Sequence, residues 1–102
     1  MYKLYLDDER IPFFEGWTIV RNFEEFKNVI IDKGLPNEMS FDHDLGDGIP
    51  TGYDCVKWMI HEMKYDLRNV DINVHSANSV GKDNIEGLIR SWNKFLDLEE
   101  GN

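Results

Sequence analysis

The sequence has few cysteines, no long apolar run and few basic residues, and each of these absences excludes a class of protein. One cysteine among 102 residues excludes an internal disulfide framework and is compatible with a reducing compartment. No apolar run approaches the roughly 18 residues of a membrane span, and the first ten residues do not resemble a signal peptide. Basic residues number 11 against 20 acidic ones, and the net charge of −9 has the wrong sign for wrapping duplex nucleic acid. We therefore expect a cytoplasmic protein that binds neither membranes nor duplex nucleic acid.

Aromatic residues, in contrast, are plentiful. The chain has 6 Phe, 4 Tyr and 3 Trp, which is enough apolar surface to form a core at this length. No repeat, low-complexity tract or linker divides the sequence. We expect a single domain over residues 1–102, and the sequence does not indicate an oligomeric state.

Three amphipathic helices are predicted from apolar spacing and capping residues. The first begins after Asn22 and ends at Gly34, which Pro36 follows. The second begins at the capping-box pattern Thr51–Asp54, and the third starts near Asp83. Their apolar stripes are Phe23, Phe26 and Ile30; Val56, Met59, Ile60 and Met63; and Ile85, Leu88, Ile89, Trp92, Phe95 and Leu96.

Four short segments between these helices are typical of strands. Strand and helix alternate from Thr18 onward, which favours a mainly parallel sheet. Residues 7–17 have little helical pattern, so we expect them to cross over as a loop or a single turn. With right-handed crossovers, the simplest arrangement is a small open α/β sheet of four strands in the order 2-1-3-4, flanked by helices. The predicted strands are Lys3–Leu6, Thr18–Val20, Met39–Phe41 and Asp71–Val74.

Polar residues follow each predicted strand. These segments begin at Asp7, Arg21, Asp42 and His75. The carboxyl ends of parallel strands share one edge, where open α/β folds bind their ligands. We therefore expect carboxylates, imidazoles and arginines to converge there.

Several other residues are explained by their part in the fold and not by chemistry. Gly46–Gly48 is typical of a turn, His61 of a helix surface, and Cys55 of helix packing. The Trp and Met residues are expected in the core, with Trp17 as the exception beside the site.

The acidic pair Asp7 and Asp8, together with Asp42 and Ser76, resembles the active site of response-regulator receiver domains. The resemblance implies a truncated receiver or flavodoxin-like fold, with Mg²⁺ or Mn²⁺ held by Asp7, Asp8 and Asp42. It also implies that Asp42 matches the phosphorylated aspartate and that Gly52 opens the next helix. These residues predict no fifth strand, matching lysine or final helix, and in this respect the sequence departs from the receiver pattern.

Longer strings resemble a receiver-derived family described as cyclic-phosphate processing domains, from Leu4 to about Ile89. The resemblance implies a receiver site that has gained histidines, which His43 and His75 match here. The strings are Leu4–Arg10, Gly16–Trp17, Ser40–Gly46, Thr51–Tyr53, and His75–Asn78 with Gly81.

Opening a cyclic phosphate with water requires a base and an acid on opposite sides of phosphorus. Two histidines can supply both at neutral pH, and a neighbouring carboxylate, Asp44 or Asp42, can orient them. A forked arginine contact and backbone N–H groups of residues 76–81 can bind the phosphoryl oxygens. The catalytic candidates are His43, His75, Asp42 and Asp44, and the substrate-binding candidates are Arg10, Arg21, Ser76, Asn78 and Gly81.

The sequence favours a phosphoesterase that acts on a cyclic phosphate of a nucleotide, an RNA end or an ADP-ribose derivative. One alternative is a non-catalytic binder that sequesters a small phosphorylated nucleotide-type ligand. Another is a Mg²⁺-dependent module phosphorylated on Asp42, and a DNA mimic is the weakest. Asp7 and Asp8 would repel phosphate unless Mg²⁺, Mn²⁺ or a basic side chain neutralises them, so metal-free and metal-assisted mechanisms both stay open.

Overall fold

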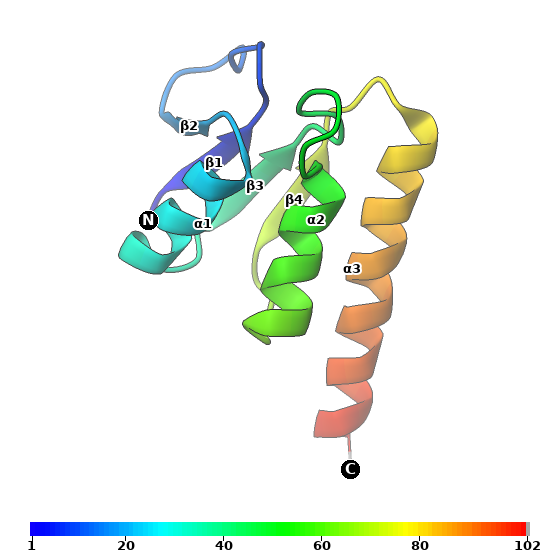
Figure 1. Cartoon of the computed structure of the whole chain (residues 1–102). Coiled ribbons are helices and arrows are strands. Elements are labelled where there is room, and N and C mark those ends of the chain that lie inside the picture. The colour runs from blue at the N-terminus through cyan, green and yellow to red at the C-terminus, as the bar shows by residue number, and fades with distance from the viewer. Residues whose placement is uncertain (102) are drawn as a thin grey trace.

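The structure is a computed structural model that describes residues 1–101. Its four strands form one parallel sheet in the order β2-β1-β3-β4 (Figure 1), which confirms the predicted topology. The pairing places Tyr5 opposite both Ile19 and Ser40, so the strands end together at one edge. The strands are β1 (Lys3–Leu6), β2 (Trp17–Val20), β3 (Glu38–Phe41) and β4 (Asp71–Val74).

The helices begin where side chains cap their first backbone N–H groups. Asn22 accepts from the Glu25 amide at the start of α1 (Phe23–Lys33), and Thr51 forms a capping box at the start of α2 (Gly52–Lys57). Asn78 caps α3 (Ser79–Glu100) by accepting from the Gly81 amide. Because of this cap, α3 begins four residues earlier than predicted, and residues 79–81 are helical instead of belonging to a loop.

The second predicted helix changes its winding part of the way along. After α2 the chain continues as a π-helical turn, η1 (Trp58–Glu62). The wider turn shifts the residues that follow it around the helix axis. Met59 and Ile60 are buried as predicted, but Met63 is 40% exposed. The stripe expected from regular α-helical spacing is therefore wrong at its last position.

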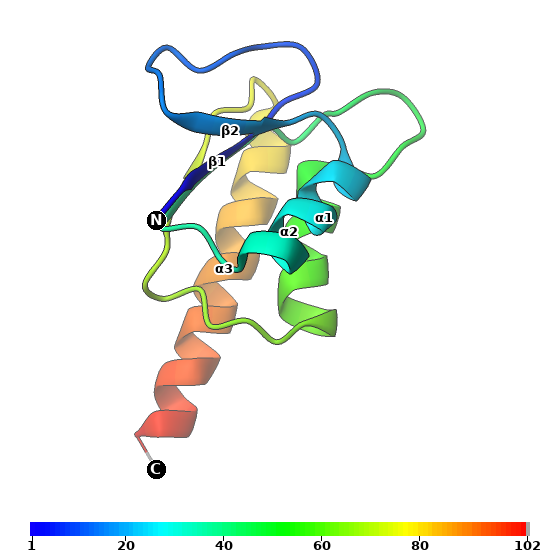
Figure 2. The same ribbon diagram turned by 90° about the vertical axis from the view of Figure 1, so that its left-hand side faces the viewer.

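The helices gather on one face of the sheet (Figures 1 and 2). Side chains alternate between the two faces along a strand, and Leu4 and Leu6 of β1 point to the face that the helices cover. They are buried in the same core as Phe26 of α1 and Val56 of α2. On the opposite face, Ile19 is 38% exposed. Residues 7–16 form an irregular loop between β1 and β2 instead of a crossover helix, as predicted.

The remaining structural expectations are mostly met. Cys55 is buried and His61 is exposed. The far end of α3 extends beyond the sheet (Figure 1), so Phe95 is 50% exposed although its spacing predicted a core position. Met1 is exposed as well, against the expectation for the methionines. Within residues 1–101, no helix combines the length and apolarity needed to cross a bilayer.

Candidate functional site

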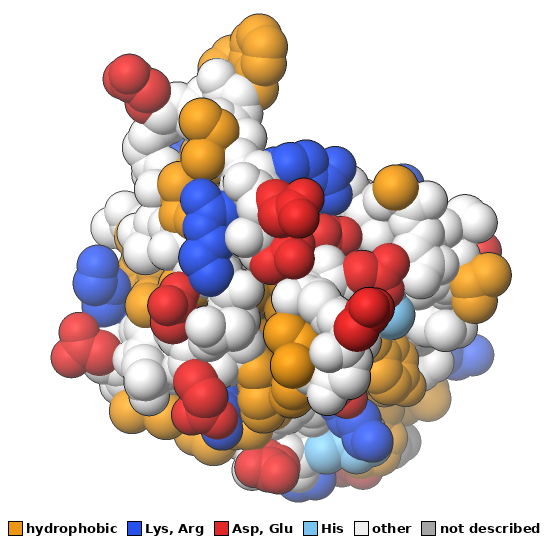
Figure 3. All heavy atoms as spheres, turned by 45° about the horizontal axis from the view of Figure 1, so that its top comes forward, with side chains coloured by type: hydrophobic (Ala, Val, Ile, Leu, Met, Phe, Trp, Pro, Cys, Tyr) orange, Lys and Arg blue, Asp and Glu red, His pale blue; other side chains and the backbone are white. Residues whose placement is uncertain are grey.

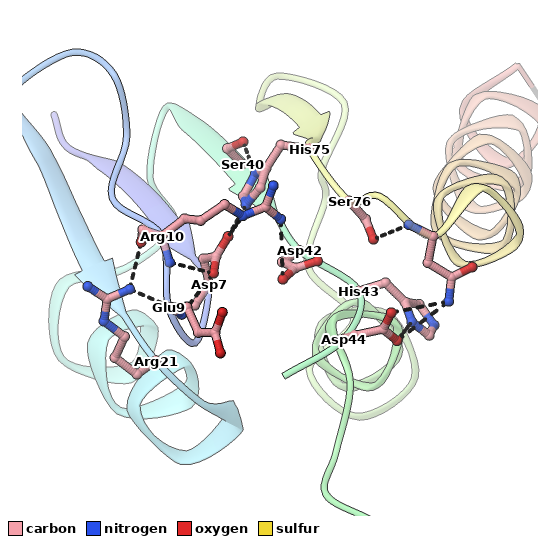
Figure 4. Close-up of polar contacts among 11 residues, drawn as sticks. Asp7, Glu9, Arg10, Arg21, Ser40, Asp42, His43, Asp44, His75 and Ser76 are labelled. Carbon is pink, nitrogen blue, oxygen red and sulfur yellow. Dashed lines mark hydrogen bonds and ion pairs between the residues drawn. The ribbon is translucent and has the colours of Figure 1, made fainter. Parts of the chain in front are cut away.

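The carboxyl edge of the sheet brings together residues that are far apart in the sequence. Strand pairing continues past the strand ends, where the Asp42 amide donates to Leu6 O and the His75 amide donates to Phe41 O. Asp7, Asp42 and His75 therefore follow three neighbouring strands at the same edge of the sheet (Figure 4).

Asp7 is buried, with 1% of its surface exposed, and its carboxylate accepts four hydrogen bonds. Oδ1 accepts from the Glu9 and Arg10 amides, both at 2.9 Å. Oδ2 accepts from Arg10 Nε at 2.8 Å and from His75 Nε2 at 3.0 Å. Burial alone would raise the pKa of Asp7, but these hydrogen bonds and the Arg10 charge outweigh it and hold the pKa below its usual value. Asp7 is therefore an ionised acceptor at neutral pH.

Both ring nitrogens of His75 have partners. Since the Asp7 carboxylate only accepts, Nε2 carries the hydrogen of that bond, and Nδ1 then accepts from Ser40 Oγ at 2.6 Å. The ring stacks on Tyr5 with centroids 4.4 Å apart. Burial lowers the pKa of His75 more than Asp7 raises it. Ser40, His75 and Asp7 thus form a hydroxyl–imidazole–carboxylate chain, and burial of the ring favours the neutral imidazole.

Sequence reasoning did not single out Ser40 or Tyr5. Ser40 lies in β3, two residues before Asp42, and this is the spacing at which side chains of an extended segment point the same way. A hydroxyl at that spacing before a candidate aspartate is the one signal that could have identified it.

His43 has a separate carboxylate partner. Its Nδ1 bonds to Asp44 Oδ1 at 2.8 Å, and this bond lowers the pKa of Asp44. Among the residues that the structure describes, none bonds to His43 Nε2. Asn78 Nδ2 also approaches the Asp44 carboxylate at 3.4 and 3.5 Å. His43 is therefore oriented through one ring nitrogen, Nδ1.

Two glycines allow the close packing around this histidine. A Cβ on Gly81 would lie 2.4 Å from His43 Cγ, so the ring rests directly on the first turn of α3. A Cβ on Gly52 would lie 2.1 Å from the Asp42 carbonyl oxygen, and the Gly52 amide donates to His43 O at 2.8 Å. At both positions a neighbouring group occupies the space that a side chain would fill; at Gly52 this group is backbone, and at Gly81 it is the His43 ring.

The two predicted arginines have different surroundings. Arg10 contacts Asp7 through Nε, its Nη2 lies 3.5 Å from Asp42 Oδ2, and its side chain is half exposed. Arg21 Nη1 donates to the backbone oxygens of Asp7 and Arg10 at 2.8 and 2.6 Å. Arg21 therefore holds the loop that carries Arg10 (Figure 4).

Residues 76–81, which follow β4, already use two of their backbone N–H groups in hydrogen bonds. The Asn78 amide donates to Ser76 Oγ at 3.0 Å, and the Gly81 amide donates to Asn78 Oδ1 at 2.9 Å. These two N–H groups are committed to the turn and the helix cap. The predicted role of Ser76, Asn78 and Gly81 in substrate binding stays a prediction.

A cavity of about 570 Å³ opens at this edge. Figure 3, which brings the edge forward, shows acidic side chains gathered near the centre with Lys and Arg beside them. Carboxylate oxygens of Asp7, Asp8 and Asp42 lie within 4.8 Å of one another. Oxygen donors of this kind suit Mg²⁺ or Mn²⁺, but the four hydrogen bonds to Asp7 leave it no free lone pair. The cavity is lined by Asp7, Asp8, Glu9, Arg10, Asp42, Asp44, Gly46 and Asp47.

Comparison with known proteins assigns the family. The profile of the cyclic-phosphate processing receiver domain matches residues 2–91, which include every predicted site residue. Neither a curated protein nor a solved structure matches the chain significantly. The matched region contains the four-stranded parallel sheet and the edge at which the two histidines lie. The chain belongs to the family of cyclic-phosphate processing receiver domains.

Proposed function

We propose that this domain hydrolyses the cyclic phosphate of a small nucleotide-type ligand, with His43 and His75 transferring the protons. The observation that carries the proposal is the pairing of each imidazole with a carboxylate at one sheet edge. His43 bonds to Asp44 at 2.8 Å and His75 bonds to Asp7 at 3.0 Å. Such pairs fix the tautomer of the imidazole and stabilise its charged form during proton transfer.

The surroundings of the histidines favour different roles. His75 has a lowered pKa and is neutral, and its Nδ1 accepts from Ser40. It suits the base, taking a proton from the attacking water through the Ser40 hydroxyl. His43 offers Nε2 and is backed by Asp44, so it suits the acid that protonates the leaving oxygen.

In the step itself, the water oxygen forms a bond to phosphorus as a ring P–O bond breaks. The water proton passes by way of Ser40 to His75 Nδ1. The leaving oxygen takes a proton from His43 Nε2, which becomes neutral. Solvent then returns both histidines to their starting protonation states.

Six of the residues that line the cavity are acidic, so Arg10 has to provide the attraction for an anionic substrate. A cyclic phosphate diester carries one negative charge, which the Arg10 guanidinium can meet. Within the described residues Arg10 Nη1 makes no hydrogen bond, and the side chain is half exposed, so it can donate to a phosphoryl oxygen. The opened monoester carries a charge of about −1.5 to −2 at neutral pH. The surrounding carboxylates repel it more strongly, which favours release of the product.

The test is a screen of the purified chain against 2′,3′-cyclic nucleotides, cyclic dinucleotides and cyclic ADP-ribose phosphates, followed by ³¹P NMR with and without EDTA. A monoester product formed by the wild type and lost in His43→Ala supports the proposal. Stoichiometric binding without product contradicts hydrolysis and indicates a sequestering protein. Labelling of Asp42 by acetyl phosphate and Mg²⁺, with no turnover, contradicts it in favour of a phospho-accepting module. Absence of both binding and turnover across the panel also contradicts it.

A further inference from the structure

One basic side chain lines the cavity at the sheet edge, and six acidic residues share that lining. On charge alone, such a cavity attracts a divalent cation. The basic residue is Arg10, whose guanidinium lies against Asp7 and Asp42, two of the three carboxylates that a metal would use. A positive group therefore already occupies the position where a cation would be held.

The contacts to Asp7 show how firmly this group is held. Arg10 donates to Asp7 with both its backbone amide, at 2.9 Å, and its side-chain Nε, at 2.8 Å. The carbonyl of Arg10 accepts from Arg21 Nη1 at 2.6 Å. The loop, the backbone and the side chain thus direct one guanidinium into the carboxylate cluster.

A carboxylate has about four lone-pair positions, and Asp7 uses all of them. The Glu9 amide and His75 Nε2 provide the remaining two hydrogen bonds. A metal that binds Asp7 must first displace one of these donors. Without Asp7, the three-carboxylate cluster offers only Asp8 and Asp42, beside a permanent positive charge.

We propose that Arg10 is the resident cation of this pocket, and that Arg10 and a divalent metal are mutually exclusive occupants of Asp7 and Asp42. The resting domain is then neutralised by its own side chain instead of by Mg²⁺. This inference goes beyond the proposed hydrolysis because it concerns the domain without substrate. It does not depend on whether the domain hydrolyses a cyclic phosphate.

The experiment measures binding of Mn²⁺ alone, from the loss of the free Mn²⁺ signal in electron paramagnetic resonance, with Mg²⁺ calorimetry beside it. Arg10→Gln removes the charge and the Nε contact, so we expect it to bind Mn²⁺ tighter than the wild type by a factor on the order of ten or more. Arg90→Gln is the control, because Arg90 is exposed on α3 and makes no ion pair with any described residue. It changes the net charge equally and should bind like the wild type. Adding Asp42→Asn to Arg10→Gln should remove the gain.

A second measurement keeps the inference testable if Arg10→Gln does not fold. In the wild type, the Arg10 Nε–H resonance should persist in ¹H–¹⁵N spectra at neutral pH, with its shift unchanged by millimolar Mg²⁺. The inference is overturned if wild type and Arg10→Gln bind Mn²⁺ equally. It is also overturned if Mg²⁺ shifts or removes the Arg10 Nε–H resonance of the wild type. Neither readout uses a phosphate, so failure of the hydrolysis proposal does not produce these results.

Discussion

Replacing Gly81 with alanine should separate activity from stability. A Cβ at this position would lie 2.4 Å from Cγ and 2.6 Å from Cδ2 of His43, whereas ordinary contacts begin near 3.4 Å. The imidazole would therefore have to retreat by about 1 Å, away from its position against α3. That movement disturbs the 2.8 Å bond to Asp44, which orients the ring.

The expected effects on rate and stability differ in size. A displacement of about 1 Å of a catalytic group costs roughly 10²-fold in rate, so kcat should fall by about that factor. Stability should change little, because alanine favours the helix by up to about 1 kcal/mol over glycine. Losing the His43–Asp44 hydrogen bond costs about the same amount. The Tm of Gly81→Ala should consequently stay within about 5 °C of the wild-type value.

The assay compares kcat, Tm and the His43 imidazole resonances of Gly81→Ala with those of Gly87→Ala. Gly87 lies on the same helix, and a Cβ there would meet only Arg90 Nη2, at 3.9 Å. The control should keep its rate and its His43 resonances. Wild-type rate and unchanged His43 resonances in Gly81→Ala would refute the packing of this histidine against the helix.

Three further outcomes follow from the site. Ser40→Ala removes the hydroxyl between water and His75, so kcat should fall on the order of 10²-fold with substrate affinity largely kept; equal losses in both would show a merely structural role. Asp7 and His75 both have lowered pKa values in the fold. The unfolded chain then binds more protons at acidic pH, so the free energy of unfolding should fall as pH drops below about 6.5. Equal free energies of unfolding from urea titrations at pH 7 and pH 5 would contradict this. Gly52→Ala places a Cβ 2.1 Å from the Asp42 backbone oxygen, and no side-chain rotation relieves this contact. The substitution should therefore lower the free energy of unfolding by about 2–3 kcal/mol. An unchanged Tm would refute the close approach.

The fold could be predicted because its signals are local. Apolar segments of four residues separated by capped helices define the strands, and the handedness of crossovers then leaves few sheet orders. The early start of α3 was missed because residues 79–81 lack an apolar stripe and the Asn78 cap lies outside the periodic region. The loss of Met63 from the core follows from a π-helical turn, which apolar spacing alone does not reveal.

The candidate site was predictable as a location but not as a set of contacts. Topology places the strand ends together, so His75 and Asp42 could be expected at one edge. The pairing of Asp7 with His75 joins residues 68 positions apart, and it depends on register and rotamers that no local pattern encodes. Sequence reasoning suggested Asp42 or Asp44 as the groups that orient the histidines. In the structure Asp44 contacts His43, whereas Asp7 takes that position for His75.

The most direct test of the central claim is the pH dependence of kcat for His43→Ala and His75→Ala on a cyclic phosphate that the wild type opens. Each single variant should lose on the order of 10²–10⁴-fold in kcat, and the double variant should be little worse than the poorer single one. The wild-type profile should be a bell that each single variant converts to one limb, while His61→Ala, exposed on η1, should match the wild type. Near-wild-type turnover in both His43→Ala and His75→Ala would contradict proton transfer by the two histidines.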